Sequence, residues 1–321
     1  MLFRSKGKLV PRMRRTARIL YLIYVALTAL EVVLLLVGGM PLFDSLVTAF
    51  GTTGTGGFAV RNASIGAYDS VYLEMVVSVF MLLSGINFNL YYIVLLKRSL
   101  KGFKSEELFC YLGLAAFATL TIALNIASRT GGLLPGLRYS FFQVCSIMTS
   151  TGYATADFDL WPSYSRALLV LLMIVGACAG STGGGVKVSR VVIVFKASLG
   201  EIRRQLFPRS VIRTTLDGER LDSAVVRNTL VYCMLYVFLA LTASLLLSLE
   251  GFDLETTVTS VIACLSNIGP GLSRVGATGN FGLWSPPGKL LLCLCMLLGR
   301  LEIFPVAMLL APGVWVRRKR S

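Results

Sequence analysis

Three short segments of the chain could supply oxygen ligands to a dehydrated cation. They read GTGGF at residues 54–58, STGYA at 150–154 and SNIGPG at 266–271. Backbone carbonyls can replace the water around a cation without carrying a full charge. Glycine favours this arrangement because it adopts positive φ angles, which can turn a carbonyl inward, without steric penalty. The segments therefore predict carbonyl-lined ion sites, although each one alone would also suit an ordinary glycine-rich turn.

A fourth segment, GACAGSTGGGVK at residues 176–187, interrupts an apolar stretch. Glycine costs a helix about 1 kcal/mol relative to alanine, and five of these twelve residues are glycine, so we expect the helix to unwind. The segment superficially resembles the phosphate-binding pattern GxxxxGK[ST]. However, Val186 separates Gly185 from Lys187, and Val188 stands where a hydroxyl residue is required. Nucleotide binding is therefore set aside.

Arg300 lies inside another apolar stretch, in the sequence LLGRLE at 297–302. A charge in such a position is a functional-site hypothesis. Glu302 is only two residues away and cannot share its helix face. Unwound backbone at 176–187 would offer free carbonyls to the N–H groups of a guanidinium. We therefore expect Arg300 to hold that segment as a gate below the ion sites; the alternative is an ion pair with an acidic residue on another helix.

Long apolar stretches surround these segments and indicate a membrane protein. Of the 321 residues, 55% are hydrophobic and 15% charged, against roughly 25% charged in soluble domains. About 20 apolar residues are needed to cross the hydrocarbon core. Stretches of that length lie at 19–37, 71–96, 108–127, 225–249 and 290–310, and a sixth at 167–195 contains the glycine-rich interruption.

A shorter segment precedes each of the three ligand segments, at 43–53, 139–149 and 256–265. These segments are too short to span a bilayer and suit re-entrant pieces. Irregular backbone at membrane depth is tolerated only where protein buries it or it lines a watery cavity, so three matching copies favour one shared aqueous path. The predicted fold is an all-α polytopic membrane protein with three span–pore-helix–span repeats, comprising six transmembrane helices and three re-entrant pore helices.

The positive charge is distributed unevenly along the chain. The net charge is +15, and most of the 31 lysines and arginines lie at 4–18, 97–104, 187–227 and 317–320. This is the positive-inside pattern of a multi-pass membrane protein. It predicts a protein of the plasma or inner membrane with both termini in the cytoplasm. It also favours membrane topology over nucleic-acid binding as the reason for the positive charge.

The cysteines and the lack of histidine limit the catalytic and metal-binding chemistry that the chain could perform. All seven cysteines have apolar neighbours and the chain contains no histidine. Small buried apolar residues are therefore a better interpretation of the cysteines than disulfides or metal ligands. Most hydrolytic triads and catalytic metal sites need histidine, so an enzyme is not predicted.

Together the motifs resemble the TrkH/KtrB family of potassium uptake proteins, within the Trk/Ktr/HKT superfamily. The resemblance covers nearly the whole chain and is carried by residues 53–58, 146–155, 176–187, 266–272 and 299–304 (TGTGGF, SIMTSTGYAT, GACAGSTGGGVK, SNIGPGL and GRLEIF). It implies a potassium-channel-like fold of four repeats around one pore, in a homodimer surrounded by membrane lipid. It also implies a cytoplasmic nucleotide-binding regulatory subunit, similar to TrkA.

The resemblance also implies site residues. The potassium ligands in the selectivity filter would be Gly54, Thr55 and Gly56, then Ser150, Thr151 and Gly152, then Asn267, Ile268 and Gly269. The gate would be Gly180, Ser181, Thr182, Gly183, Gly184, Gly185 and Lys187, with Arg300 as the arginine that contacts it. The resemblance implies no catalytic residue and no organic cofactor in this chain.

The chain departs from the family pattern in showing three repeats where the family has four. Residues 19–97, 98–198 and 224–314 resemble family repeats two, three and four, with a basic N-terminus at 1–18, a cytoplasmic loop at 199–223 and a basic tail at 315–321. Three sets of carbonyls cannot surround an ion fourfold. The chain is therefore interpreted as lacking the first repeat, through an internal start, a truncated gene product, or a protein encoded in parts.

The function predicted from the sequence is potassium uptake by the ion-translocating subunit of a Trk-type system. A sodium-conducting relative is one alternative, because in this family a serine in place of the first-repeat glycine is linked to sodium passage. Glycine in all three visible loops favours potassium. A non-conducting remnant, or an assembly partner of a full-length transporter, is the alternative from another class.

Overall fold

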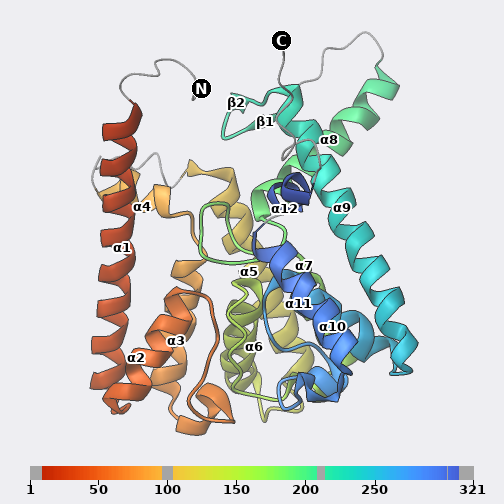
Figure 1. Cartoon of the computed structure of the whole chain (residues 1–321). Coiled ribbons are helices and arrows are strands. Elements are labelled where there is room, and N and C mark those ends of the chain that lie inside the picture. Colours follow the sequence, from red (N-terminus) through yellow and green to blue (C-terminus); the bar gives the residue numbers. More distant parts are fainter. Residues whose placement is uncertain (1–8, 96–103, 208–213, 302, 311–321) are drawn as a thin grey trace.

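The computed structural model describes residues 9–95, 104–207, 214–301 and 303–310, which are mostly helical (Figure 1). The predicted basic tail at 315–321 lies outside the described residues. The same holds for the first eight residues of the predicted N-terminal segment and for residues 208–213 of the predicted loop.

The helices follow one another in three groups of similar order. The first contains α1 (Leu9–Val37), α2 (Leu42–Thr53), α3 (Val71–Ser84) and α4 (Phe88–Leu95). The second contains α5 (Glu106–Ile126), α6 (Leu133–Met148), α7 (Ser163–Ile174) and α8 (Val188–Leu206). The third contains α9 (Ser223–Leu247), α10 (Leu254–Ser266), α11 (Pro286–Arg300) and α12 (Ile303–Leu310). In each group the short second helix ends at a predicted ion-ligand segment.

The remaining elements are short. Single 3-10 turns lie at Ser64–Tyr68, Phe158–Leu160, Ser248–Glu250, Ser273–Val275 and Phe281–Leu283. Strands β1 (Thr215–Leu216) and β2 (Glu219–Arg220) pair antiparallel. Asp217 and Gly218 connect them with φ angles of 52° and 78°, as a two-residue hairpin turn requires.

Three helices in the described residues are long and apolar enough to cross a membrane: residues 16–37, 106–126 and 223–250. Helices α3 and α4 provide a fourth candidate if they count as one span, although they are bent by 89°. The predicted spans at 71–96 and 290–310 are each broken into two helices, α3 and α4 in the first and α11 and α12 in the second. The count of six spans stays a prediction.

The break between α3 and α4 is possible because other residues satisfy the carbonyls that it frees. The last carbonyls of a helix have no partner within the helix. Here the Tyr111 hydroxyl donates to the Leu82 carbonyl at 3.0 Å. The amide of Cys178 donates to the Gly85 carbonyl, also at 3.0 Å. Both donors come from distant parts of the chain, so the sequence of 71–96 alone does not predict the break.

The short helices begin at identifiable signals. Helix α10 starts after Asp253, whose side chain accepts a hydrogen bond from the amide of Thr256 at 2.9 Å. Helix α6 begins at Leu133, earlier than the predicted start at 139, directly after Gly131 and Gly132 with positive φ angles of 79° and 140°. Pro135 is compatible with this earlier start because the first turn of a helix needs no amide donor.

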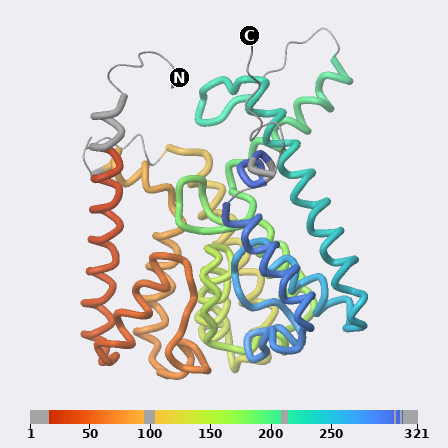
Figure 2. The backbone as a smooth tube through the Cα atoms, in the orientation of Figure 1, coloured from red at the N-terminus to blue at the C-terminus, as the bar shows by residue number. Residues whose placement is uncertain are grey.

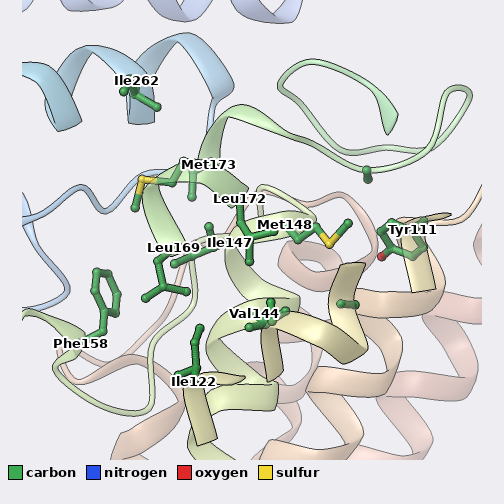
Figure 3. Close-up of a cluster of buried hydrophobic side chains, with 14 of the residues drawn as sticks. Tyr111, Ile122, Val144, Ile147, Met148, Phe158, Leu169, Leu172, Met173 and Ile262 are labelled. Atoms are coloured by element: carbon green, nitrogen blue, oxygen red, sulfur yellow. The ribbon is translucent and has the colours of Figure 1, made fainter. Parts of the chain in front are cut away.

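The core is centred on α6, whose residues from 142 onward are all buried. One face of α6, with Val144, Ile147 and Met148, packs against Leu169 and Leu172 of α7 (Figure 3). Helices α1 and α9 lie at opposite outer sides of the molecule (Figures 1 and 2), and both expose many large apolar side chains. The short helices are therefore enclosed, and the outer helices present the apolar surface that a lipid bilayer requires.

Candidate functional site

The three predicted ligand segments leave their helices with the same backbone conformation. We call them loop A (54–58), loop B (150–154) and loop C (266–271). Positive φ angles occur at Thr55 (51°), Ser150 (56°) and Asn267 (56°), and again two residues later at Gly57 (66°), Gly152 (85°) and Gly269 (112°). Positive φ is uncommon for residues other than glycine. Its repetition in three places shows that the loops share one local structure.

Hydrogen bonds to the preceding helices give the three loops a common register. The amides of Gly56, Thr151 and Ile268 each donate to the carbonyl five residues earlier, at 2.7, 2.9 and 2.9 Å. These three residues are therefore structural equivalents. Each lies between the two positive-φ positions of its loop, where the chain reverses direction at the end of a short helix.

The common register corrects the alignment of loop A. Gly57, and not Gly56, corresponds to Gly152 and Gly269, so the predicted set that begins at Gly54 is shifted by one residue relative to the other two. The equivalent set in loop A runs from Thr55 to Gly57. Two adjacent glycines permit either alignment in the sequence, and only the end of α2 decides between them.

Loops A, B and C lie against one another in that order. A Cβ atom added to Gly57 would lie 1.7 Å from the carbonyl oxygen of Thr151, and one added to Gly152 would lie 2.0 Å from that of Ile268. Nothing in the described residues lies within 4 Å of a Cβ added to Gly269. The glycines of loops A and B are thus needed for close backbone contact, while loop C has an open side.

A cavity of about 670 Å³ occupies that open side, between loops A and C. Residues 54–56 and 267–269 line it from the two loops, and Met296 and Arg300 line it from α11. The Asn267 side chain donates to the Met296 carbonyl at 3.1 Å and so fastens loop C to α11. Within the described part of the chain, loops A and C therefore face each other across a space rather than through a contact.

Residues 175–187, which we call the crossing loop, separate α7 from α8. Val175 and Val186 pair in a parallel bridge, and the amide of Gly176 donates to the Val186 carbonyl at 2.8 Å. A Cβ atom on Gly176 would lie 2.1 Å from the carbonyl oxygen of Gly184. The helix unwinds here, as its glycine content predicts, and at Gly176 glycine is also needed for close approach of the two ends of the loop.

The crossing loop contacts loop A and α11 through a single carbonyl. The Thr55 hydroxyl donates to the Thr182 carbonyl at 2.8 Å, and Nη1 of Arg300 donates to the same oxygen at 2.9 Å. The contact expected between Arg300 and the glycine-rich segment is therefore present. Arg300 reaches an uncharged backbone oxygen, whose partial negative charge attracts the guanidinium without neutralising it.

The crossing loop also contacts loop B and the end of α10. The amide of Gly184 donates to the Ser150 hydroxyl. A Cβ atom on Gly184 would lie 2.2 Å from the Ser266 carbonyl oxygen. The loop therefore touches loop A, loop B and the end of α10, and Gly184 cannot gain a side chain without displacing the end of α10.

The predicted gate residues fall into two groups. Residues 181–185, Lys187 and Arg300 line a second cavity of about 240 Å³, together with Tyr232 and Gly299. Nζ of Lys187 donates to the Gly183 carbonyl. Gly180 lies elsewhere: its carbonyl accepts from the amide of Phe88 at 3.2 Å, at the start of α4.

Glu107 supports the crossing loop and was not predicted as a site residue. It is buried in the first turn of α5. Its Oε1 accepts hydrogen bonds from the amides of Ala179 at 2.6 Å and Ser189 at 3.2 Å. The signal in the sequence is a pair of glutamates at the start of an apolar stretch, a pattern that any helix N-terminus favours, so the sequence alone does not single out Glu107.

Long apolar helices enclosing short helices and polar loops define a multi-pass membrane protein with an internal polar site. The TrkH family model, described as a cation transport protein, matches residues 4–128 and 136–314. The chain belongs to this family, which is one of transport proteins and not of enzymes.

Curated relatives and a solved structure agree with the family assignment. The Trk system potassium uptake protein TrkH of Salmonella typhimurium is 34% identical over 312 residues, and TrkG of Escherichia coli is 34% identical over 311 residues. Each alignment covers 96% of this chain and 64% of the relative. The crystal structure of the potassium transporter TrkH from Vibrio parahaemolyticus matches with a TM-score of 0.89 and 31% identity, covering 97% of this chain and 67% of that one. The chain thus spans just under two thirds of the length of these curated relatives.

Proposed function

We propose that this chain forms the ion-translocating part of a Trk-type potassium uptake system. The observation that carries the proposal is the meeting of three loops of equal conformation directly at the crossing loop. Such an arrangement supplies carbonyl oxygens at one level and a removable obstruction next to them. The names of the relatives, which are potassium uptake proteins, are the reason for choosing potassium as the ion.

The ion ligands are the backbone carbonyls of loops A, B and C. In the common register these belong to residues 55–57, 150–152 and 267–269. The short helices direct their negative C-terminal ends toward the same region, which favours a cation. Uncharged carbonyls suit a weakly hydrated ion such as potassium, since they replace its water without holding it too tightly to leave.

The gate is the crossing loop together with Arg300. The guanidinium contributes a positive charge beside the 240 Å³ cavity, and its hydrogen bond to Thr182 holds the loop beneath loop A. A cation on the pathway therefore meets both a steric and an electrostatic barrier. Release of the Thr182 carbonyl by Arg300 and Thr55 would allow the loop to move aside.

A fourth set of ligands is needed to complete the pore, in the space between loops A and C. The open side of loop C and the 670 Å³ cavity support this part of the proposal. We place the chain in the plasma or inner membrane with three repeats and six spans. The order of the helices supports the repeats, and the charge distribution favours cytoplasmic termini. A homodimer and a TrkA-like nucleotide-binding subunit are the proposed partners, with lipid around the outer helices.

Substitution of Arg300 tests the proposed gate. In the native transporter, purified with its partners and reconstituted into liposomes, Arg300→Ala removes a charged hydrogen bond worth about 1.5–3 kcal/mol, so potassium flux should rise about tenfold or more. Arg129→Ala is the matched control, because it removes an arginine that likewise donates to a backbone carbonyl, that of Leu160 at 2.6 Å, away from the crossing loop and from both cavities. Unchanged or lower flux in well-folded Arg300→Ala protein would contradict the gate.

Two further measurements separate the alternatives. Restored growth of an uptake-deficient bacterium at low potassium, on expression of this chain alone, would exclude a non-conducting remnant. Flux measured in potassium and in sodium would identify the transported ion, and a preference for sodium would overturn the assignment of potassium.

A further inference from the structure

The first turn of α5 joins three parts of the molecule that are distant in sequence. The amide of Glu106 donates to Oδ1 of Asp217 at 2.6 Å, and the Ser105 hydroxyl donates to Oδ2 of the same residue. Ser105 is the residue before α5 but makes no capping hydrogen bond of its own to the helix. Asp217, at the turn of the β1–β2 hairpin, therefore caps α5 from outside it.

The same turn of α5 is bound to α8 and to the crossing loop. The Glu106 side chain pairs with Lys196 of α8, and Lys196 also donates to the Thr215 carbonyl of β1 at 3.0 Å. The next residue, Glu107, accepts from the amides of Ala179 and Ser189. Consecutive helical residues point to different faces, so Glu106 pairs with the middle of α8, while Glu107 faces the crossing loop and the first turn of α8.

Glu107 is well suited to hold the crossing loop. Its two amide donors, Ala179 and Ser189, lie on either side of the glycine-rich residues 180–185, so one carboxylate binds the chain before and after them. The side chain is buried, and a hydrogen bond to an ionised acceptor is stronger than one between neutral groups. A shift of the first turn of α5 would therefore move or release the crossing loop at Ala179 and the start of α8 at Ser189 together.

The geometry points to Glu107 as the positioning residue of the gate, and to the β1–β2 hairpin, through Asp217, as the element that holds Glu107 in place. This inference rests on the proposed gating role of the crossing loop and adds its regulation. The hairpin turn is exposed, so a cytoplasmic partner that binds it could pull Asp217 from α5. Displacement of the hairpin would then loosen the crossing loop without any contact between the partner and the pore.

Flux measurements on variants of the whole reconstituted transporter test the inference. Glu107→Ala should raise potassium flux in the absence of a stimulus by about tenfold, since it removes two charge-assisted hydrogen bonds. Glu107→Gln should stay within about twofold of the native flux because its amide oxygen can accept from the same two amides. Asp217→Ala should raise flux by a smaller factor, and adding it to Glu107→Ala should produce no further rise, since residues that act through one another are not additive.

Hydrogen exchange supplies a readout that general loss of stability would not reproduce. Exchange should speed up in a peptide covering residues 175–190 of both alanine variants and stay unchanged in a peptide from α6. Asp222→Ala is the matched control: Asp222 caps α9 from the same segment, through the amide of Ala224 at 3.2 Å, and no hydrogen bond or ion pair among the described residues joins it to α5. Its flux and its exchange at 175–190 should equal those of the native protein.

The outcomes distinguish this inference from the proposed gate. If Arg300→Ala raises flux while Glu107→Ala changes neither flux nor exchange at 175–190, the positioning role is wrong and the gate stands. If Asp217→Ala behaves like Asp222→Ala, the hairpin does not act on Glu107. If Arg300→Ala also leaves flux unchanged, the gate itself fails and this inference fails with it.

Discussion

Gly152→Ala is the sharpest test of the idea that contact between loops sets the position of the ligand carbonyls. The substitution has two effects. It places a side chain at a φ of 85°, which costs about 1–3 kcal/mol. It also places a Cβ atom 2.0 Å from the Ile268 carbonyl oxygen, whereas ordinary contact begins at about 3.4 Å. Loop C or loop B must therefore move by more than 1 Å.

Gly269→Ala is the matched control, because it shares the first effect without the second. Its φ is 112°, and nothing in the described residues lies within 4 Å of the added Cβ. A displacement near 1 Å in a site of fixed geometry can cost about a hundredfold in rate. We expect Gly152→Ala to lose about a hundredfold in potassium flux and to discriminate poorly between potassium and sodium, and Gly269→Ala to retain most of both.

The assay is flux of potassium and of sodium into liposomes containing the purified transporter, normalised to the amount of folded protein. Thermal unfolding of each variant measures the shared strain separately. Equal flux and equal selectivity in the two variants, at comparable stability, would refute the reasoning, since the close contact between loops B and C would then have no influence on the ion sites.

Three further predictions follow from single contacts. Ser150→Ala removes the acceptor of the Gly184 amide, and leaving that buried donor unpaired costs about 1–3 kcal/mol. Potassium flux without a stimulus should therefore rise several-fold. Unchanged flux would show that this hydrogen bond does not hold the gate. Asp253→Ala should cost about 1 kcal/mol of stability through loss of a helix cap. Hydrogen bonds from the amide and then the hydroxyl of Thr256 hold the pKa of Asp253 below its usual value of 3.8, so the stabilisation by Asp253 is complete at neutral pH and is lost as the pH falls through that lowered pKa. Thermal unfolding at pH 7 and pH 3 should therefore show a smaller difference between native and variant protein at the lower pH. Arg138→Ala leaves the buried Glu74 carboxylate without the two hydrogen bonds of 2.6 and 2.8 Å that Arg138 donates, so stability should fall by roughly 3 kcal/mol. The double variant Arg138→Met with Glu74→Gln should recover most of that loss.

The sequence predicted the elements whose signal is local. Length and apolar character located α1, α5 and α9 to within a few residues, apart from the longer N-terminal part of α1. Glycine content located the crossing loop, and the isolated charge of Arg300 pointed to its contact with that loop. In each case the physical cause lies within about twenty consecutive residues, so a single sequence is sufficient to read it.

The features that the sequence did not predict depend on distant partners. The apolar stretch at 71–96 looks continuous, yet α3 ends where Tyr111 and Cys178 can satisfy its carbonyls. The register of loop A was predicted one residue too early because Gly56 and Gly57 are interchangeable by type, and the hydrogen bond from Gly56 to the end of α2 is what distinguishes them. Glu107 is an unremarkable helix-start residue until Ala179 and Ser189 are found beside it.

The hydrogen bonds around the crossing loop also constrain where water can go. Its amides and carbonyls are paired with Gly85, Phe88, Thr55 and Glu107, and any movement that separates these pairs exposes polar backbone at membrane depth. Each such group left without a hydrogen-bond partner costs about 1–3 kcal/mol, so the loop can move only if water enters at the same time. In the proposed gate, opening and hydration are therefore a single event, and solutes that lower the activity of water should favour the closed pathway.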